Sequence, residues 1–477
     1  MYATSLDHYI DGKWMQPTSG KTQDVMNPST NATLGKLGHA SKGDLDKALA
    51  AAAKGFAVWR KVSAFERGKI LKKVAELMRA RADEIANVLT LEQGKVLAEA
   101  KVEVLGSADI IEWFAEEGRR AYGRIIPARA DGVRNMVLME PVGPVAGFSP
   151  WNFPVSQAAR KIGGALAAGC SIIVKCPEET PASPIAFVKC FHDAGVPPGV
   201  VNIVFGVPSE ISEYLIPSPI IRKISFTGSV PVGKHLNALA AMHMKRATME
   251  LGGHAPVLVF DDVETDQVAT LLSGMKFRNA GQVCVSPTRF FVHEKVYDKF
   301  VGKFTDLAAG LKVGDGLDPK SNMGPLANPR RIAAMESIIQ DAQEKGAKAT
   351  TGGKRIGNQG NFFEPTVLTD VPANARIMTE EPFGPVAVMM RFKDTDKMLA
   401  EANSLPFGLA SYAFTKNGQL AAKVADALDA GMVSVNHFGI ALPETPFGGV
   451  KDSGFGHEGG IEGLNAYLSA KFVSYMG

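Results

Sequence analysis

The side chain best suited to covalent chemistry is a cysteine at the exit of a polar, turn-forming segment. Cys284 ends the segment FRNAGQVC, whose glycine and polar residues are the neighbours that a reactive thiol requires. A free thiol titrates at about pH 8.5, so it needs a base or a field of N–H dipoles to attack as a thiolate. The other cysteines fit the role of small buried hydrophobes, because Cys170 and Cys176 flank an apolar run and Cys190 lies in an apolar helical stretch.

Two kinds of base are available to this thiol. In a Cys–His hydrolase the first candidate is His254, with His293 and His437 further off, although no motif pairs any of the nine histidines with Cys284. The alternative is Glu250 in the segment MELGG. A carboxylate beside two glycines, at the junction of two α/β halves, can face a cleft between them. It can equally be an ion-paired residue at a domain edge.

A short apolar run leads into a turn suited to binding a phosphate. The run 222–226 is followed by Thr227, Gly228 and Ser229, and we expect a helix over 232–243. At such a strand–turn–helix junction, the bare N–H groups of the helix N-terminus face an anion such as a pyrophosphate. An ordinary turn between a strand and a helix is the alternative.

A lysine and a glutamate lie at the end of an earlier expected strand. Lys175 ends the run 171–175, and Glu178 follows three residues later. The lysine can donate to a ribose hydroxyl and the glutamate can accept from it, whereas Glu178 would repel a 2′-phosphate. The alternative is an ion pair at the protein surface.

A literal G-x-G-x-x-G motif at 454–459 predicts no cofactor site. The motif requires a strand and a helix within a βαβ unit of roughly 30 residues, and only 18 residues follow Gly459. We predict a glycine-rich loop at this position.

The elements that must position these residues alternate between short apolar runs and helical stretches. Such alternation is typical of βαβ units in a parallel, doubly wound sheet, so the fold class is α/β. A second α/β stretch begins near Gly253 and continues past Val435. The expected strands lie at 142–148, 171–175, 201–205, 222–226 and 255–260.

The first third of the chain has a helical pattern. Ser63 and Glu66 have the spacing of a capping box ahead of apolar residues at three- and four-residue intervals. A second helix is expected over 97–117. The strands expected at 133–140 and 471–476 interrupt or follow the α/β pattern.

Length and composition exclude several classes of protein. The 477 residues suggest two or three domains. With 52 basic and 49 acidic residues, the net charge of +3 argues against binding nucleic acid. The longest uncharged stretch, 141–159, contains four prolines and cannot span a membrane. Four cysteines without close pairs make neither a disulfide scaffold nor a zinc site, so we expect no metal and a reduced, soluble, cytoplasmic protein.

Seven motifs, taken together, resemble the NAD(P)-dependent aldehyde dehydrogenase superfamily in the family's order and over nearly the whole chain. The similarity is closest to the succinate-semialdehyde and 2-oxoglutarate-semialdehyde dehydrogenase subgroup. The motifs are PWNFP from Pro150, KCPE from Lys175, FTGS from Phe226, ELGG from Glu250, GQVC from Gly281, EEPFGP from Glu380 and PFGG from Pro446.

The resemblance implies a role for individual residues. Cys284 would be the nucleophile, Glu250 the general base, and Asn152 with the Cys284 N–H the oxyanion hole. The chain departs from the family at Pro231, where a glutamate is frequent, and at His254, where a lysine is frequent. The implied cofactor is NAD, with NADP as an alternative, and the implied cofactor-binding residues are Ser149, Trp151, Lys175, Glu178, Gly228, Ser229, Glu381 and Phe383.

Two arginines suggest the class of aldehyde. Arg160 lies eight residues after Asn152, and Arg278 lies six before Cys284. A pair of guanidinium groups suits a carboxylate, and Ser286 lies in a segment that resembles the semialdehyde subgroup. We expect a semialdehyde with a terminal carboxylate, such as succinate, glutarate or 2-oxoglutarate semialdehyde.

Other functions remain open at this point. A structural role for either arginine would favour a general aliphatic or aromatic aldehyde dehydrogenase. A thiol hydrolase or acyltransferase without hydride transfer, and a non-catalytic binding protein on the same fold, are alternatives of other classes.

The architecture that the resemblance implies has three parts. A Rossmann-like NAD-binding domain would comprise 1–117 and 141–252, and an α/β catalytic domain 253–445. A small β arm, 118–140 and 462–477, would mediate oligomerisation into a homodimer or homotetramer.

Overall fold

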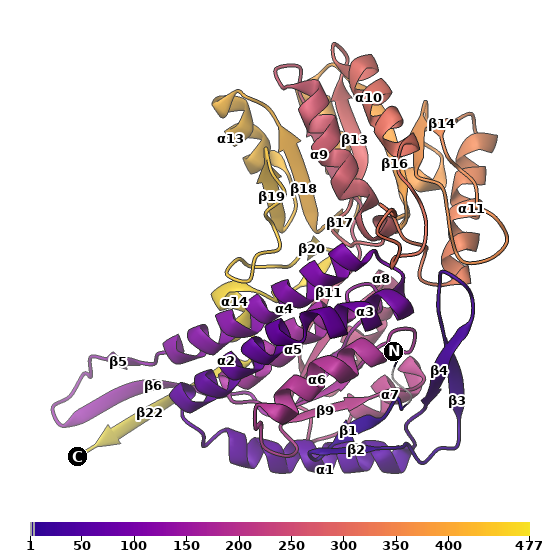
Figure 1. The fold of residues 1–477 in the computed structure, drawn as a ribbon. Helices are drawn as coiled ribbons and strands as arrows, with labels where there is room; N and C mark the ends of the chain where they lie inside the picture. Colours follow the sequence, from indigo (N-terminus) through magenta and orange to yellow (C-terminus); the bar gives the residue numbers. More distant parts are fainter. Residues whose placement is uncertain (1, 3–4) are drawn as a thin grey trace.

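Two sheets of mainly parallel strands form the two lobes of the molecule in the computed structural model, which describes residue 2 and residues 5–477 (Figure 1). The first sheet has eight strands in the order β2-β1-β9-β8-β7-β10-β11-β21. Its central strands are fully buried and mainly apolar, as expected of a parallel sheet covered on both faces. The parallel strands are β7 (Val145–Phe148), β8 (Ile172–Lys175), β9 (Val201–Val204), β10 (Lys223–Thr227) and β11 (Arg246–Glu250), and the antiparallel ones are β1 (His8–Ile10), β2 (Lys13–Met15) and β21 (Gly454–Phe455).

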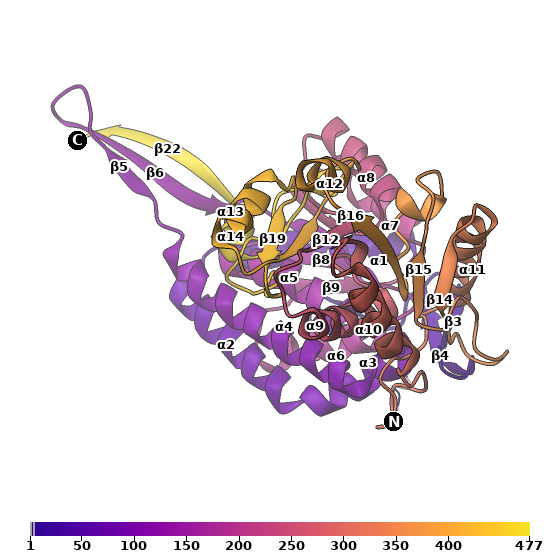
Figure 2. The ribbon, with the colours of Figure 1, turned by 90° about the horizontal axis from the view of Figure 1, so that it is seen from above.

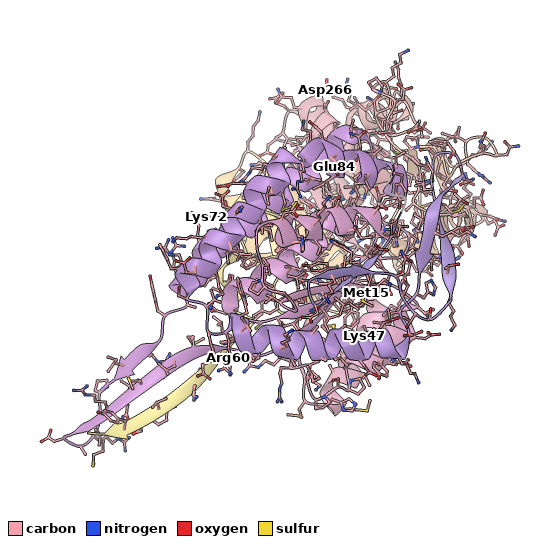
Figure 3. All side chains as sticks on the ribbon, turned by 60° about the horizontal axis from the view of Figure 1, so that its bottom comes forward. Met15, Lys47, Arg60, Lys72, Glu84 and Asp266 are labelled. Carbon is pink, nitrogen blue, oxygen red and sulfur yellow. The ribbon has the colours of Figure 1, made fainter. Side chains whose placement is uncertain are left out.

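Helices cover both faces of this sheet. Because side chains alternate along a strand, Ile172 and Val174 of β8 pack in one core with α2–α6, while Ile173 packs in another with α1, α7 and α8. Charged side chains such as Lys47 and Glu84 lie on the exposed faces of the helices (Figure 3). The helices are α1 (Lys42–Trp59), α2 (Ala64–Ala80), α3 (Ala82–Gln93), α4 (Leu97–Glu117), α5 (Pro154–Ala168), α6 (Ala182–Asp193), α7 (Pro208–Leu215) and α8 (Val230–Met242).

The second sheet has seven strands in the order β14-β15-β16-β13-β12-β18-β19, and only β14 is antiparallel to its neighbour. Helices α9–α11 pack on one face and α12 and α13 on the other. The strands are β12 (Ala255–Val259), β13 (Pro287–His293), β14 (Lys348–Thr351), β15 (Thr366–Thr369), β16 (Val386–Phe392), β18 (Ala410–Phe414) and β19 (Met432–Val435). The helices are α9 (Thr265–Phe277), α10 (Tyr297–Ala309), α11 (Pro329–Glu344), α12 (Thr395–Ala402) and α13 (Gly418–Ala427).

A three-stranded arm projects from the first lobe (Figures 1 and 2). Strand β6 (Val133–Pro141) pairs with the terminal strand β22 (Leu468–Met476) at nine positions, and β5 (Arg124–Ile126) flanks β6. Several of its apolar side chains are exposed, among them Ile125 at 80% and Met476 at 74%.

The helical pattern expected for the first third of the chain is wrong before residue 42. Four strands precede α1: the pair β1–β2 and the hairpin of β3 (Thr22–Met26) and β4 (Thr33–Gly38). Between β1 and β2, Asp11 and Gly12 both have positive φ, 50° and 78°. An Asp-Gly pair with this backbone is the signature of a two-residue hairpin turn.

Element boundaries differ from the expected ones by a few residues. Ser63 caps α2 by accepting from the Glu66 N–H, but the Glu66 carboxylate pairs with Lys69 instead of reaching back. Helix α8 begins at Val230, two residues early, because Pro231 suits the first turn of a helix. Helix α4 has the expected bounds.

No helix among the described residues is long and apolar enough to cross a membrane. Several short elements complete the structure. They are η1 (Gly118–Arg120), η2 (Arg278–Gly281), η3 (Arg376–Met378), β17 (Phe407–Gly408), β20 (Val450–Lys451) and α14 (Gly460–Asn465).

Candidate active site

The turn before Cys284 has an unusual backbone. Three consecutive residues, Asn279, Ala280 and Gly281, have positive φ values of 49°, 52° and 71°. A Cβ at Gly281 would overlap the carbonyl group of Gly384 on the neighbouring loop, so only glycine fits. The turn therefore ends α9 abruptly and places Cys284, half-buried, between the two sheets.

Asn152 lies beside this turn. It lies in the connection between β7 and α5, and its Nδ2 donates to the carbonyl oxygen of Gln282 at 3.1 Å. A primary amide has two N–H groups, so this bond leaves the second for another acceptor. Asn152 thus contacts the turn that carries Cys284, and its role at an oxyanion stays a prediction.

Glu250 ends β11 and is 2% exposed. Neither of its carboxylate oxygens has a hydrogen-bond partner among the described residues. Burial, reinforced by the charge of Glu458, raises its pKa well above the usual range, while Lys161 and Arg160 oppose the rise. A carboxyl group in this state can exchange a proton near neutral pH.

A buried ion pair that the sequence analysis missed lies next to Glu250. The Lys161 Nζ is 2.6 Å from the Glu458 carboxylate, and both side chains are almost fully excluded from solvent. Lys161 also donates to the Thr227 hydroxyl at 2.6 Å. The available signal was Lys161, which with Arg160 makes two adjacent charges in the mainly small and apolar α5, because a buried cation requires a partner. Glu458 belongs to the glycine-rich segment 454–459.

The pKa of the Cys284 thiol is raised to about 12, mainly by burial and then by the nearby carboxylates Glu381 and Glu250. The Val285 N–H and Arg160 act in the opposite direction and lower this pKa. The resting group is therefore the protonated thiol, and attack requires removal of its proton. Burial likewise raises the pKa of Cys170 and Cys190 to about 11 and of Cys176 to about 12.

The histidines considered as bases for Cys284 are engaged elsewhere. The ring nitrogens of His254 bond the Thr288 hydroxyl at 2.7 Å and the Ile377 carbonyl oxygen at 2.8 Å, and burial lowers its pKa to about 3. His293 lies 3.9 Å from Asp261, and Nδ1 of His437 accepts the Gly439 N–H. The Cys–His pairing of a hydrolase is thus not formed by any of these three.

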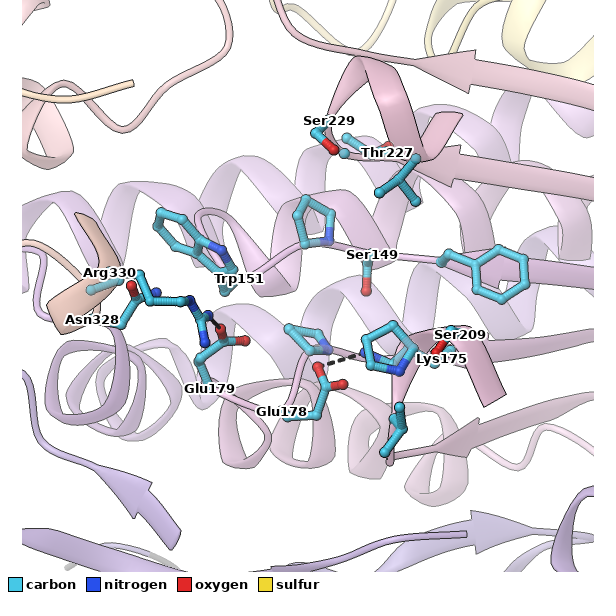
Figure 4. A pocket seen from close by; sticks show the side chains of 18 of the residues that line it. Ser149, Trp151, Lys175, Glu178, Glu179, Ser209, Thr227, Ser229, Asn328 and Arg330 are labelled. Carbon is cyan, nitrogen blue, oxygen red and sulfur yellow. Dashed lines mark hydrogen bonds and ion pairs between the residues drawn. The ribbon is translucent and has the colours of Figure 1, made fainter. Parts of the chain in front are cut away.

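A cavity of about 1270 Å³ opens at the carboxyl ends of β7, β8 and β10 (Figure 4). At one point on its wall the Lys175 Nζ lies 2.6 Å from the Glu178 carboxylate. Six of the eight residues expected to bind the cofactor line it: Ser149, Trp151, Lys175, Glu178, Gly228 and Ser229.

The cavity wall fits a dinucleotide. The Ser149 hydroxyl is buried and has no partner among the described residues, so it is available to a ligand. A Cβ at Gly228 would overlap the Phe226 ring, so the backbone at the N-terminus of α8 stays bare. Ser229 precedes α8 without a capping bond, which leaves N–H groups for an anion.

The other two expected cofactor residues come from the second lobe. The Phe383 ring meets Trp151 edge-on, with ring centroids 5.7 Å apart. Glu381 packs against Gly252. Burial raises the pKa of Glu381 to about 8, although the Gly253 N–H, Arg331 and Lys276 each lower it. These two residues lie at the end of the site toward Cys284, since the Glu381 charge acts on that thiol.

The three expected substrate residues differ in how they are placed. Arg160 donates through Nη1 to the Glu458 carbonyl oxygen and through Nη2 to that of Ala441 at 3.0 Å. Arg278 is half-buried, with an unpartnered Nε and its guanidinium 5.6 Å from the centre of the Phe153 ring. Ser286 accepts from the Lys276 ammonium at 3.3 Å. The guanidinium of Arg278 is thus available to a ligand, whereas that of Arg160 is engaged by two backbone carbonyl groups.

Comparisons with known proteins identify the family. The aldehyde dehydrogenase family model matches residues 14–473. The chain belongs to the aldehyde dehydrogenase family. It is 48% identical over 467 residues to a putative 4-(hydroxymethyl)benzenesulfonate dehydrogenase of Comamonas testosteroni, which covers 98% of this chain and 97% of the relative.

Two further similarities concern proteins of Escherichia coli. The chain is 42% identical over 464 residues to its NADP-dependent succinate-semialdehyde dehydrogenase, covering 97% of this chain and 96% of that one. It superposes on the crystal structure of an E. coli NADP-dependent enzyme with a TM-score of 0.97 and 41% identity, covering 99% and 98%. These matches confirm the expected aldehyde dehydrogenase fold and an NAD(P)-dependent aldehyde dehydrogenase, so the hydrolase and non-catalytic alternatives are wrong.

Proposed function

We propose that this aldehyde dehydrogenase oxidises a semialdehyde whose far end carries an anionic group, with NAD as the hydride acceptor. The observation that carries the proposal is Arg278, a half-buried cation six residues before Cys284 with an unpartnered Nε. Its guanidinium can bind a carboxylate in a fork of two hydrogen bonds. Succinate, glutarate and 2-oxoglutarate semialdehydes are the substrates proposed.

The reaction that these residues support begins at Cys284. Its sulfur attacks the aldehyde carbon as Glu250 takes the thiol proton, and the tetrahedral thiohemiacetal places its oxyanion on the Asn152 amide and the Cys284 N–H. Collapse of this intermediate to the thioester requires a hydride acceptor, and the dinucleotide that Lys175, Glu178 and Ser229 would hold would supply one. Glu250 releases the thiol proton to solvent and then takes a proton from water, whose oxygen bonds to the thioester carbon as the C–S bond breaks. The proton held by Glu250 then returns to the sulfur, which leaves the acid and the restored thiol.

The relatives support an anionic substrate. Their names refer to succinate semialdehyde and to a benzenesulfonate, and both compounds end in an anion. A general aldehyde dehydrogenase is the second candidate. It is favoured by Arg160, whose terminal nitrogens already bond two carbonyl groups, so that recognition rests on one arginine.

NAD is proposed over NADP because of Glu178. Its carboxylate lies 2.6 Å from the Lys175 ammonium in the cofactor cavity and would repel a 2′-phosphate there. The eight residues expected at the cofactor keep that proposed role: six line the cavity, and Glu381 and Phe383 lie at its catalytic end.

The domain roles are proposals as well. Residues 1–117 and 141–252 would bind the cofactor, 253–445 would carry Cys284, and the arm of 118–140 and 462–477 would join copies into a homodimer or homotetramer. Exposed apolar side chains on the arm, such as Ile125, Phe472 and Met476, support this role, because exposed apolar patches mark protein contacts. Four free cysteines support a cytoplasmic location.

Paired aldehydes test the substrate proposal. Succinate semialdehyde is compared with butanal, and 4-carboxybenzaldehyde with benzaldehyde, by the absorbance of reduced cofactor with NAD and with NADP. We expect kcat/KM to favour the anionic member by about 10- to 100-fold, because a charge-assisted hydrogen bond contributes about 1.5–3 kcal/mol. Equal values within each pair would overturn the anionic substrate and leave the general aldehyde dehydrogenase.

A further inference from the structure

A buried lysine lies behind the proposed oxyanion hole, outside every motif discussed above. Lys95 belongs to the connection between α3 and α4 and is 1% exposed. Its Nζ donates to the backbone carbonyl oxygen of Asn152 at 2.8 Å and to the Glu103 carboxylate at 2.5 Å. The ammonium also lies 3.8 Å from the centre of the Phe153 ring. Lys95 thus contacts Asn152 and the residue after it.

The partner of this lysine fixes the other end of the same segment. The second oxygen of Glu103 accepts the N–H groups of Val155 at 3.0 Å and Ser156 at 3.2 Å, in the first turn of α5. That turn has no side-chain cap of its own, because Phe153 occupies the N-cap position. Lys95 and Glu103 together hold residues 152–156 from behind.

The Asn152 carbonyl oxygen has a second donor from the cysteine turn. Nδ2 of Asn279 lies 3.1 Å from it. Asn279 is in turn held by the same α3–α4 region, since its Oδ1 accepts from Gln93 at 2.9 Å and its backbone N–H donates to Glu99 at 2.9 Å. The α3–α4 connection therefore supports both Asn152 and the turn that carries Cys284.

We propose that Lys95, held by Glu103, is a positioning residue that fixes Asn152 so that its free amide N–H meets the oxyanion. A buried ion pair contributes little net stability over an apolar pair, so its value here lies in fixing position. The bond to the carbonyl group immobilises the Asn152 backbone, while the Gln282 carbonyl group orients its side chain. This inference rests on the proposed role of Asn152.

Kinetics of a Lys95→Met variant test the proposal. Because Lys95→Met alone leaves the Glu103 charge buried without a partner, Lys95→Met/Glu103→Gln is the second variant, and its glutamine keeps an acceptor for α5. We expect kcat to fall by about 10- to 100-fold in both variants, since an oxyanion donor is misplaced. KM and the fluorescence-measured Kd for NADH should change by less than about threefold. Lys101→Met is the matched control and should keep wild-type kcat, because it removes an exposed charge from α4, the helix that carries Glu103.

An Asn152→Ala background separates positioning from general damage. If Lys95 acts through Asn152, Lys95→Met should lower kcat no further in that background, because the donor that it positions is gone. Alkylation of Cys284 by iodoacetamide, which forms no oxyanion, should proceed at the wild-type rate in Lys95→Met.

Two outcomes overturn the inference. One is a Lys95→Met effect of the same size with and without the Asn152 amide, and the other is slowed alkylation. A wild-type kcat for Asn152→Ala alone would instead contradict the proposed oxyanion hole.

Discussion

The Lys161 ammonium and the Glu458 carboxylate lie 2.6 Å apart in the interior, joining the helix after the oxyanion segment to the C-terminal part of the chain. Both groups act on the pKa of Glu250, since Glu458 raises it and Lys161 lowers it. The basicity of Glu250 is therefore set by the balance of this pair and by burial.

Glu250→Gln should slow both the attack of Cys284 and the hydrolysis of the thioester, because Glu250 is the proposed base for both steps. We expect steady-state kcat to fall by about 10²- to 10⁴-fold, the range for loss of a general base. Stopped-flow absorbance should show that the first turnover of reduced cofactor is slowed as well, because the thiol has lost its base. A steady-state rate equal to that of the wild type would show that Glu250 is not the base for water.

The pH dependence of kcat should follow the pKa of Glu250. A base acts when deprotonated, so the rate rises as pH rises through its pKa. In Glu458→Gln a negative neighbour is lost, the pKa of Glu250 falls, and the acid limb should move to lower pH. In Lys161→Met a positive neighbour is lost and the limb should move to higher pH. Shifts in the same direction for both variants would contradict the account.

Glu178→Gln should broaden cofactor use. Removing the carboxylate leaves the Lys175 ammonium without its partner at 2.6 Å, so a 2′-phosphate meets a net positive charge. We expect kcat/KM for NADP to rise by about tenfold, which corresponds to about 1.4 kcal/mol. Glu179→Gln, at the neighbouring carboxylate that pairs with Arg330, is the control and should alter NAD and NADP use equally. An unchanged NADP-to-NAD ratio in Glu178→Gln would remove the proposed discrimination.

Substitutions of Arg278 and of Arg160 should affect different kinetic properties. Arg278→Gln should raise KM for succinate semialdehyde by about 10- to 100-fold with little change for butanal, because the loss is one charge-assisted contact. Arg160→Met should impair both substrates and lower the melting temperature, since Arg160 holds the Glu458 and Ala441 carbonyl groups. Equal losses on both aldehydes for Arg278→Gln would assign that residue a structural role.

The strands and the catalytic turn were predictable because their signals are local. Apolar runs marked β8 and β9 to within one residue, and polar neighbours separated Cys284 from the three buried cysteines. The Asp11–Gly12 turn was also readable locally, although the helical pattern of the following residues obscured it.

Other parts of the site were not predictable, because their partners are distant in sequence. Lys161 and Glu458 are 297 residues apart, and Lys95 meets Asn152 across 57. Periodicity and spacing report on neighbours along the chain, so a charge in an apolar helix indicates that a partner exists without naming it. The hydrogen bonds from Arg160 to two backbone carbonyl groups likewise depend on the folded structure and could not be predicted from the sequence.

The order of strands in the first sheet constrains how the protein is made. Strand β21 and Glu458 belong to the first lobe but are synthesised after the entire second sheet. Until the ribosome has released them, the ammonium on α5 has no counter-charge and β11 has an open edge. The first lobe therefore cannot be completed while the remainder is translated, and a chain ending before residue 458 would carry the proposed nucleophile Cys284 without a finished site around it.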